Sequence, residues 1–290
     1  MKKLVLATAL ATMASVSFAD VMISGKYEGK MKEDSTTGNY TYTSDLDLTL
    51  KGKVGDTVMT STFENIGKST SDKTVKVKQV FIETPITEGL NFKGGTYKFT
   101  NGTGLLQEST TKDRMNLNAT FGGVNAGVTQ VSNTGDSEYN FSGKLGPATV
   151  TVNDAMEDDR FITVTGEMGG AKIVFESQEY STGKTNTGVS AGLSVGAIDL
   201  TGVYLDVQDT AGVFQTDGII GDVSDANSGT TVTGVVASTN TSFGKVTGKH
   251  ITKNDINSMV GQVQVGNWKL TATKPENADA KFEASLKVKF

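Results

Sequence analysis

The chain of 290 residues contains no cysteine, three prolines, one tryptophan and one histidine. Without cysteine, no disulfide can stabilise the fold, whichever compartment the protein occupies. The lone histidine, His250, would have to serve any Ser-His-Asp catalysis, yet it stands beside Lys249 in a strand-like segment that has no nucleophile elbow. We therefore expect no enzyme, no cofactor and no metal site. Acidic groups such as Glu157-Asp158-Asp159 are interpreted as solvated loops.

Long apolar runs are also scarce. Beyond the N-terminal segment, no run approaches the roughly 18 apolar residues of a membrane helix. Only 36% of the residues are hydrophobic, whereas a soluble core of this size would need more leucine, isoleucine and phenylalanine. The formal net charge of −5 and the lack of a basic patch with interleaved aromatic residues exclude nucleic acid as a partner. Disorder is disfavoured because polar and apolar residues alternate regularly along the chain.

The N-terminus has the pattern of a secretory signal peptide. Met1-Lys2-Lys3 is basic, residues 4–18 are mostly apolar or small, and Ser17-Phe18-Ala19 offers small residues at the positions that a signal peptidase reads. We therefore predict that the protein is exported and cleaved after Ala19. The remaining residues, 20–290, are expected to form a single domain.

Residues 279–290 carry the clearest structural pattern. Apolar residues occupy every second position, so a strand here would be apolar on one face and polar on the other. Its length suits the tilted strand of roughly 9–11 residues that spans a bilayer. A slip of one residue would turn lysines toward lipid, at up to about 2–4 kcal/mol each near the midplane. The apolar positions are Phe282, Ala284, Leu286, Val288 and Phe290.

The same alternation recurs in about 18 segments along the chain. Short glycine-rich turns join the segments at one end, whereas longer polar connections, such as residues 100–113 and 209–229, join them at the other. This asymmetry is typical of an outer-membrane barrel with short periplasmic turns and longer outer loops. The predicted fold is therefore all-β: a transmembrane antiparallel up-and-down β-barrel of about 18 strands, with 16 as the alternative.

Within residues 90–99 the alternation changes phase. Leu90 and Phe92 share one face, whereas the next two aromatic residues fit that face only after a shift of one position. Gly94-Gly95 lies between them, so we expect a β-bulge there that returns Lys98 to the polar face. Aromatic residues should also form two girdles at the lipid–water interfaces. The expected members are Tyr40, Tyr42, Tyr97, Phe99, Tyr139 and Tyr180 at the outer rim, and Phe121, Phe243, Trp268 and Phe290 at the periplasmic rim.

On these residues the chain resembles the general, non-specific porin family of Gram-negative bacterial outer membranes. The resemblance rests on the export signal, the opening strand at residues 21–27, the segment 80–98, hairpins of the type seen at residues 118–124, and the terminal Phe290. It covers essentially the whole mature chain. It implies a homotrimer of water-filled barrels that contacts outer-membrane lipid and lipopolysaccharide.

The resemblance also implies where the pore narrows. The third outer loop, residues 100–113, would fold inward and place Glu108, Lys112 and Asp113, with the adjacent Arg114, opposite charges on the wall. The family's usual acidic loop motif and arginine-rich wall are not recognisable in this sequence. Phe290 would belong to the signal that the barrel-assembly machinery reads. The candidate wall residues are Lys26, Asp45, Asp47, Lys76, Lys78 and Lys98.

The predicted function is passive diffusion of small hydrophilic solutes and ions through a water-filled outer-membrane channel. Two alternatives stay open: a substrate-selective channel, for example for sugars, and a secreted β-rich adhesin or fibre. A sugar channel is expected to line its path with aromatic side chains, whereas most aromatic residues here fall on the outward face. A β-solenoid fibre is expected to show a fixed repeat, and the hairpins here differ in length.

Overall fold

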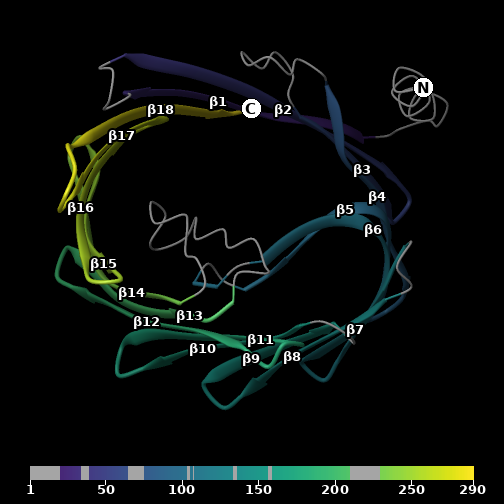
Figure 1. Cartoon of the computed structure of the whole chain (residues 1–290). Helices are drawn as coiled ribbons and strands as arrows, with labels where there is room; N and C mark the ends of the chain where they lie inside the picture. Colours follow the sequence, from purple (N-terminus) through teal and green to yellow (C-terminus); the bar gives the residue numbers. More distant parts are fainter. Residues whose placement is uncertain are drawn as a thin grey trace.

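The computed structural model describes residues 20–33, 39–64, 75–102, 105–106, 108–132, 136–155, 159–209 and 229–290. They form one antiparallel sheet of 18 strands. Each strand pairs with its neighbours in sequence, and the first strand also pairs with the last, so the sheet closes into a barrel (Figure 1). The strands are β1 (Asp20–Glu33), β2 (Tyr40–Val54), β3 (Thr57–Glu64), β4 (Lys76–Thr87), β5 (Leu90–Asn101), β6 (Glu108–Phe121), β7 (Val124–Val131), β8 (Ser137–Leu145), β9 (Ala148–Ala155), β10 (Asp159–Met168), β11 (Ala171–Tyr180), β12 (Thr185–Val195), β13 (Ile198–Val207), β14 (Thr230–Thr241), β15 (Gly244–Lys253), β16 (Ile256–Val265), β17 (Trp268–Pro275) and β18 (Lys281–Lys289).

The predicted barrel and its strand number of 18 are confirmed. A closed sheet leaves no strand edge with unpaired backbone groups, which is the condition for a sheet to exist in lipid. The observed closure also differs from the fibre alternative, because the last strand returns to the first instead of extending a stack. Within the described residues, no helix has the length and apolarity needed to cross a membrane.

The two rims of the barrel differ in their connections, as predicted. At the tight rim, every connection from an even-numbered strand to the next strand is a turn of two residues, from Gly55-Asp56 to Gly266-Asn267. At the long rim most connections are longer, although Asn254-Asp255, between β15 and β16, is also a two-residue turn. Both of its residues have positive φ, 46° and 65°, which suits the primed turns that match the twist of a hairpin. The N-terminal end of β1 and the C-terminal end of β18 lie on the tight-rim side.

The two faces of the sheet differ in chemistry. Successive side chains of β11 alternate between Phe175, which is exposed on the outer surface, and Val174 or Glu176, which are buried on the inner face. Along the outer surface, most strands expose apolar side chains, as in β1, where Ile23 is 63% exposed. The inner face carries most of the charged side chains. The alternation of apolar and polar residues along each strand thus gives the barrel an apolar outer surface and a polar inner surface.

The aromatic girdles agree with the prediction at the tight rim and only in part at the long rim. Phe121, Phe243, Trp268 and Phe290 are exposed near the tight rim, and Tyr40, Tyr42 and Tyr139 near the long rim. The prediction is wrong for three other aromatic residues. Tyr97 and Tyr180 are 3% and 4% exposed, and both lie on the inner face, as does Phe99, whose ring faces the Arg114 guanidinium.

The distal part of the β5–β6 hairpin leaves the barrel wall. Strand β5 pairs with β4 only as far as Thr96, and β6 pairs with β7 only as far as Arg114. Beyond these points residues 97–101 and 108–112 pair with each other. Figure 1 shows this end of the hairpin running from the wall into the interior of the barrel. We call residues 97–101 and 108–112 the inward hairpin.

Gly95 marks the point at which β5 departs from the wall. Its φ is 125°, a value that only glycine adopts readily, and a Cβ atom there would collide with the carbonyl oxygen of Val80. The strand pairing passes through Gly94 and Gly95 without a register shift. The predicted bulge is therefore wrong, and Lys98 lies on the face opposite to that of Tyr97.

Candidate functional site

The tip of the inward hairpin docks on the far wall of the lumen. Leu105 and Leu106, which we call the hairpin tip, are 1% and 0% exposed. The backbone N–H of Leu106 donates a hydrogen bond of 2.6 Å to Oε2 of Glu176, a fully buried carboxylate of β11. The tip packs into an apolar cluster on the inner face of β10–β15, which we call the apolar socket: Phe161, Val174, Val203, Leu205, Val232 and Ile251.

The base of the inward hairpin is fixed by a buried arginine. The Arg114 side chain is 1% exposed, and its Nη2 lies 3.4 Å from Oε1 of Glu138 on β8. Arg114 also donates to Oγ1 of Thr110 at 2.6 Å and to the carbonyl oxygen of Thr110 at 3.2 Å. Hydrogen bonds to a charged group are stronger than neutral ones. The hairpin is therefore held at both ends, by a charged contact at its base and by apolar packing at its tip.

These positions revise the predicted loop. Residues 100–113 were expected as a loop, but strand β5 extends to Asn101 and β6 begins at Glu108. Lys112 and Asp113 are exposed on opposite faces of β6, and Asp113 accepts a hydrogen bond from the hydroxyl of Thr96. The connection itself is limited to residues 102–107. The charges that the sequence placed in a loop thus stand on strands, whereas Leu105 and Leu106, within the connection, pack against the opposite wall.

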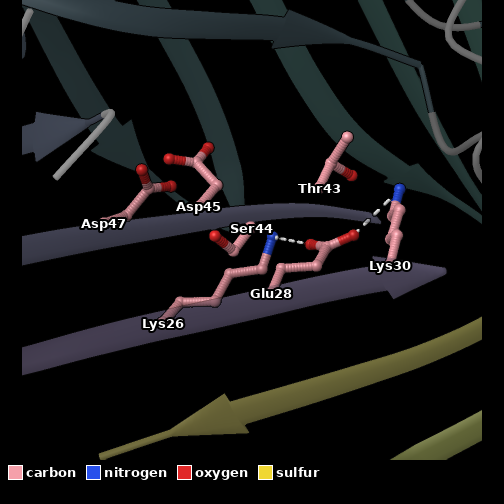
Figure 2. Close-up of a pocket in the computed structure, with 7 residues that line it drawn as sticks. All are labelled: Lys26, Glu28, Lys30, Thr43, Ser44, Asp45 and Asp47. Carbon is pink, nitrogen blue, oxygen red and sulfur yellow. Dashed lines mark ion pairs between the residues drawn. The ribbon is translucent and has the colours of Figure 1, made fainter. Parts of the chain in front are cut away.

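Charged side chains form two columns of one sign each on the wall near the β1–β18 pairing. On β2, Asp45 and Asp47 project into the lumen, and Figure 2 shows them beside the β1 side chains. On β18, Lys287 and Lys289 are exposed on the same inner face, because Lys289 stands directly opposite Lys26 of β1. The acidic column belongs to the candidate wall residues, whereas the basic column of β18 is missing from them.

Strand β1, between the two columns, carries one glutamate that is paired with two lysines. Glu28 forms ion pairs with Lys26 at 2.5 Å and with Lys30 at 2.9 Å (Figure 2). In the next strands, Lys78 pairs with Glu64 at 2.9 Å. These pairs are partly exposed, so each contributes little to stability. They matter more for the lumen, because they leave the columns on β2 and β18 as the less compensated charges.

The remaining candidate residues lie outside the two charged columns. Lys76 stands opposite Glu64 at the long-rim end of β4. Lys98 lies on the inward hairpin and not on the wall, so its assignment as a wall residue is wrong. His250 stands between Val235 and Met259, two exposed residues of the outer surface. No group of three or more metal-ligating side chains occurs among the described residues.

Sequence reasoning missed the residues that fix the hairpin tip. Leu105-Leu106 is an apolar pair in a polar connection, and that contrast is the signal that could have indicated a buried contact. Glu176 gives no such signal, because it occupies an ordinary polar position in the alternation of β11.

The likeness to known proteins lies in the fold. No family model and no curated protein matches the chain. Among solved structures, Pseudomonas aeruginosa OccD3 (OpdP) is 9% identical with a TM-score of 0.65, over 96% of this chain and 94% of that chain. Pseudomonas aeruginosa OpdO is 12% identical with a TM-score of 0.64, over 94% and 97%. Pseudomonas aeruginosa OccK2 (OpdF), solved in complex with glucuronate, is 10% identical with a TM-score of 0.61, over 94% and 98%.

These neighbours are outer-membrane porins of a substrate-specific type. The likeness thus agrees with the porin fold that the sequence resemblance implied, and it does not support the general, non-specific type. At identities this low, the comparison establishes the fold alone. The chain shares the fold of these neighbours, which in this chain is a closed barrel of 18 strands.

Proposed function

We propose that this chain forms a water-filled channel in a bacterial outer membrane, through which small hydrophilic solutes and ions diffuse. The observation that carries the proposal is the closed barrel whose outer surface is apolar and whose inner wall is charged. In lipid, a closed sheet satisfies all its ladder hydrogen bonds, and the charged inner face keeps water in the lumen. The porin neighbours support the same proposal.

The inward hairpin is the proposed constriction of this channel. It occupies part of the cross-section, and its exposed residues Lys98, Lys112 and Asp113 are polar. Charged groups at a narrow point set the preference of a channel for cations or anions. Neutralising Lys112 and Asp113 separately should therefore shift the reversal potential in opposite directions, measured across a salt gradient.

Planar-bilayer recording tests the channel directly. Purified, folded protein should produce discrete conductance steps that are proportional to the applied voltage. A sample unfolded by heat before addition is the control and should be silent. A folded barrel that inserts into the bilayer without conducting would contradict the proposal.

A substrate-selective channel is the second candidate. Two observations favour it: the wall carries both signs of charge in a fixed arrangement, and one structural neighbour was solved with glucuronate. A selective channel should show saturating uptake of its substrate, whereas a general pore should show uptake that rises linearly with concentration. Proteoliposome uptake measured over a wide concentration range separates the two.

We also propose how the chain reaches its membrane and assembles. Residues 1–19, which lie outside the described part, would direct export, Phe290 would be read by the barrel-assembly machinery, and the barrels would associate as homotrimers in contact with lipopolysaccharide. Chemical cross-linking in isolated outer membranes should give a trimer band. Cross-linking that yields only monomers would contradict the homotrimer.

A further inference from the structure

The wall on both sides of the β1–β18 pairing carries charge that changes sign across the strands. Residues directly opposite one another on paired strands lie side by side on one face. Two such rows cross β18, β1 and β2, and each begins with a lysine and ends with an aspartate. Neighbouring strands are about 4.8 Å apart, so the lysine at one end of each row and the aspartate at the other end are separated by about 10 Å. The rows are Lys289, Lys26 and Asp47, and Lys287, Glu28 and Asp45.

The charges at the two ends of these rows are less compensated than those in the middle. Glu28 is already bound by Lys26 and Lys30 on its own strand. Within the described residues, no ion pair is formed by Lys287, Lys289, Asp45 or Asp47.

The two aspartates also have unused hydrogen-bonding capacity. One oxygen of Asp45 and one of Asp47, Oδ1 in both, are shielded from solvent and have no hydrogen-bond partner. A buried polar atom without a partner is costly, and an incoming donor would relieve that cost.

Two cavities cover this stretch of wall. One of about 330 Å³ is lined by Lys26, Asp45 and Asp47, and the other, of about 490 Å³, by Lys287 and Lys289. Both also include Glu28 and Lys30 in their lining, so the anionic and cationic ends meet along β1. Because a water molecule occupies about 30 Å³ of liquid, either cavity has room for part of a solute.

We propose that this wall binds elongated zwitterions, solutes whose positive and negative groups lie about 10 Å apart. The inference rests on the proposed channel and names the solute class that its wall would favour. An ammonium group would sit at Asp45 and Asp47, and a carboxylate at Lys287 and Lys289. An extended chain advances about 3.3–3.6 Å per residue, so a peptide of about three residues spans the distance. A solute with one charge is attracted by one column and repelled by the other.

Uptake of four small probes into proteoliposomes tests this proposal. Triglycine carries both charges at the required separation, N-acetyl-triglycine only the negative one, triglycine amide only the positive one, and glycine both charges close together. At concentrations below saturation, triglycine should enter faster than each of the others by about two- to five-fold, the effect of one exposed ion pair. Potassium chloride conductance, recorded for the same preparations, reports whether the channel itself is intact.

Two variants locate the binding site. Asp45→Asn with Asp47→Asn should reduce triglycine uptake to the level of N-acetyl-triglycine, and Lys287→Gln with Lys289→Gln to the level of triglycine amide. Lys172→Gln removes an exposed lysine at the tight-rim end of β11, away from these rows, and should keep the preference. If the folded wild type does not conduct, the channel proposal fails. If it conducts without favouring triglycine, or if both wall variants retain the preference, the zwitterion site is refuted and the channel stands.

Discussion

The hairpin tip offers the sharpest test of the lumen architecture. Leu105 and Leu106 are almost fully buried in the apolar socket, so replacing both by alanine removes most of what holds the tip on the far wall. Burying one leucine is worth about 1.5–3 kcal/mol, which gives about 3–6 kcal/mol for the pair. Each 1.4 kcal/mol changes an equilibrium about tenfold. Even the lower value therefore shifts the ratio of docked to released hairpin by about 100-fold.

The double variant should still form the barrel. The inward hairpin pairs with itself beyond Thr96 and Arg114, so its release leaves the wall ladders intact. Single-channel recording should show a larger mean conductance and more open-channel noise, because the hairpin then samples several positions. Leu193→Ala with Leu270→Ala is the matched control, since both leucines are exposed on the outer surface, 45% and 54%. Unchanged conductance and noise in the Leu105→Ala, Leu106→Ala variant would refute the idea that the tip fixes the constriction.

Four further changes test other contacts. Gly95→Ala should lower the yield of folded, heat-modifiable barrel on gels, because φ at this position is 125° and the new Cβ would collide with the carbonyl oxygen of Val80. The control is Gly248→Ala, which should fold normally because no atom lies within 4 Å of the position of its new Cβ. Glu138→Gln should lower the free energy of unfolding by about 1–3 kcal/mol, because it leaves the Arg114 guanidinium buried without its carboxylate. The control is Glu179→Gln, which breaks an exposed ion pair with Arg160 and should change the free energy of unfolding little. Hydrogen bonds from the backbone and side-chain N–H groups of Asn257 hold the pKa of Glu276 below its ordinary value. This contact should stabilise the β17–β18 connection at neutral pH and be lost as the pH falls through that lowered pKa. The protection factor for hydrogen exchange at the Asn257 amide, which corrects for the intrinsic pH dependence of exchange, should fall in acid in the wild type and show no such pH step in Glu276→Gln. Deleting Phe290 should impair assembly in cells far more than Phe290→Tyr, and equal effects would contradict its role as a recognition signal.

The barrel itself could be predicted from the sequence because the alternation that defines each strand lies within a few consecutive residues. Side chains in a strand alternate between the two faces, and a membrane barrel places lipid on one face and water on the other. Phe282 to Phe290 shows this alternation without a break. Each segment can therefore be assigned from its own residues, and the pairing follows from the order of the hairpins.

The interior of the lumen could not be predicted in this way. The prediction for Tyr97 and Lys98 assumed that β5 stays in the wall, where a polar outward residue would be unfavourable. In the structure that part of β5 never reaches the outer surface, so Lys98 can occupy that face without a bulge. Leu105 and Leu106 contact Phe161 and Ile251, which are distant in sequence. Nothing in the local pattern indicates such partners.

The pairing of β1 with β18 has a consequence for biosynthesis. Gly25 and Phe290 exchange backbone hydrogen bonds of 2.7 and 3.1 Å across that pairing, and these residues come from nearly opposite ends of the chain. Contacts so far apart in sequence form late and slowly, because a long loop must first be closed. Without β18, strands β1 and β17 would each keep an edge of unpaired backbone N–H and C=O groups. Such unpaired groups are unfavourable in the hydrocarbon core of a membrane. A chain truncated before β18 should therefore fail to form the closed barrel.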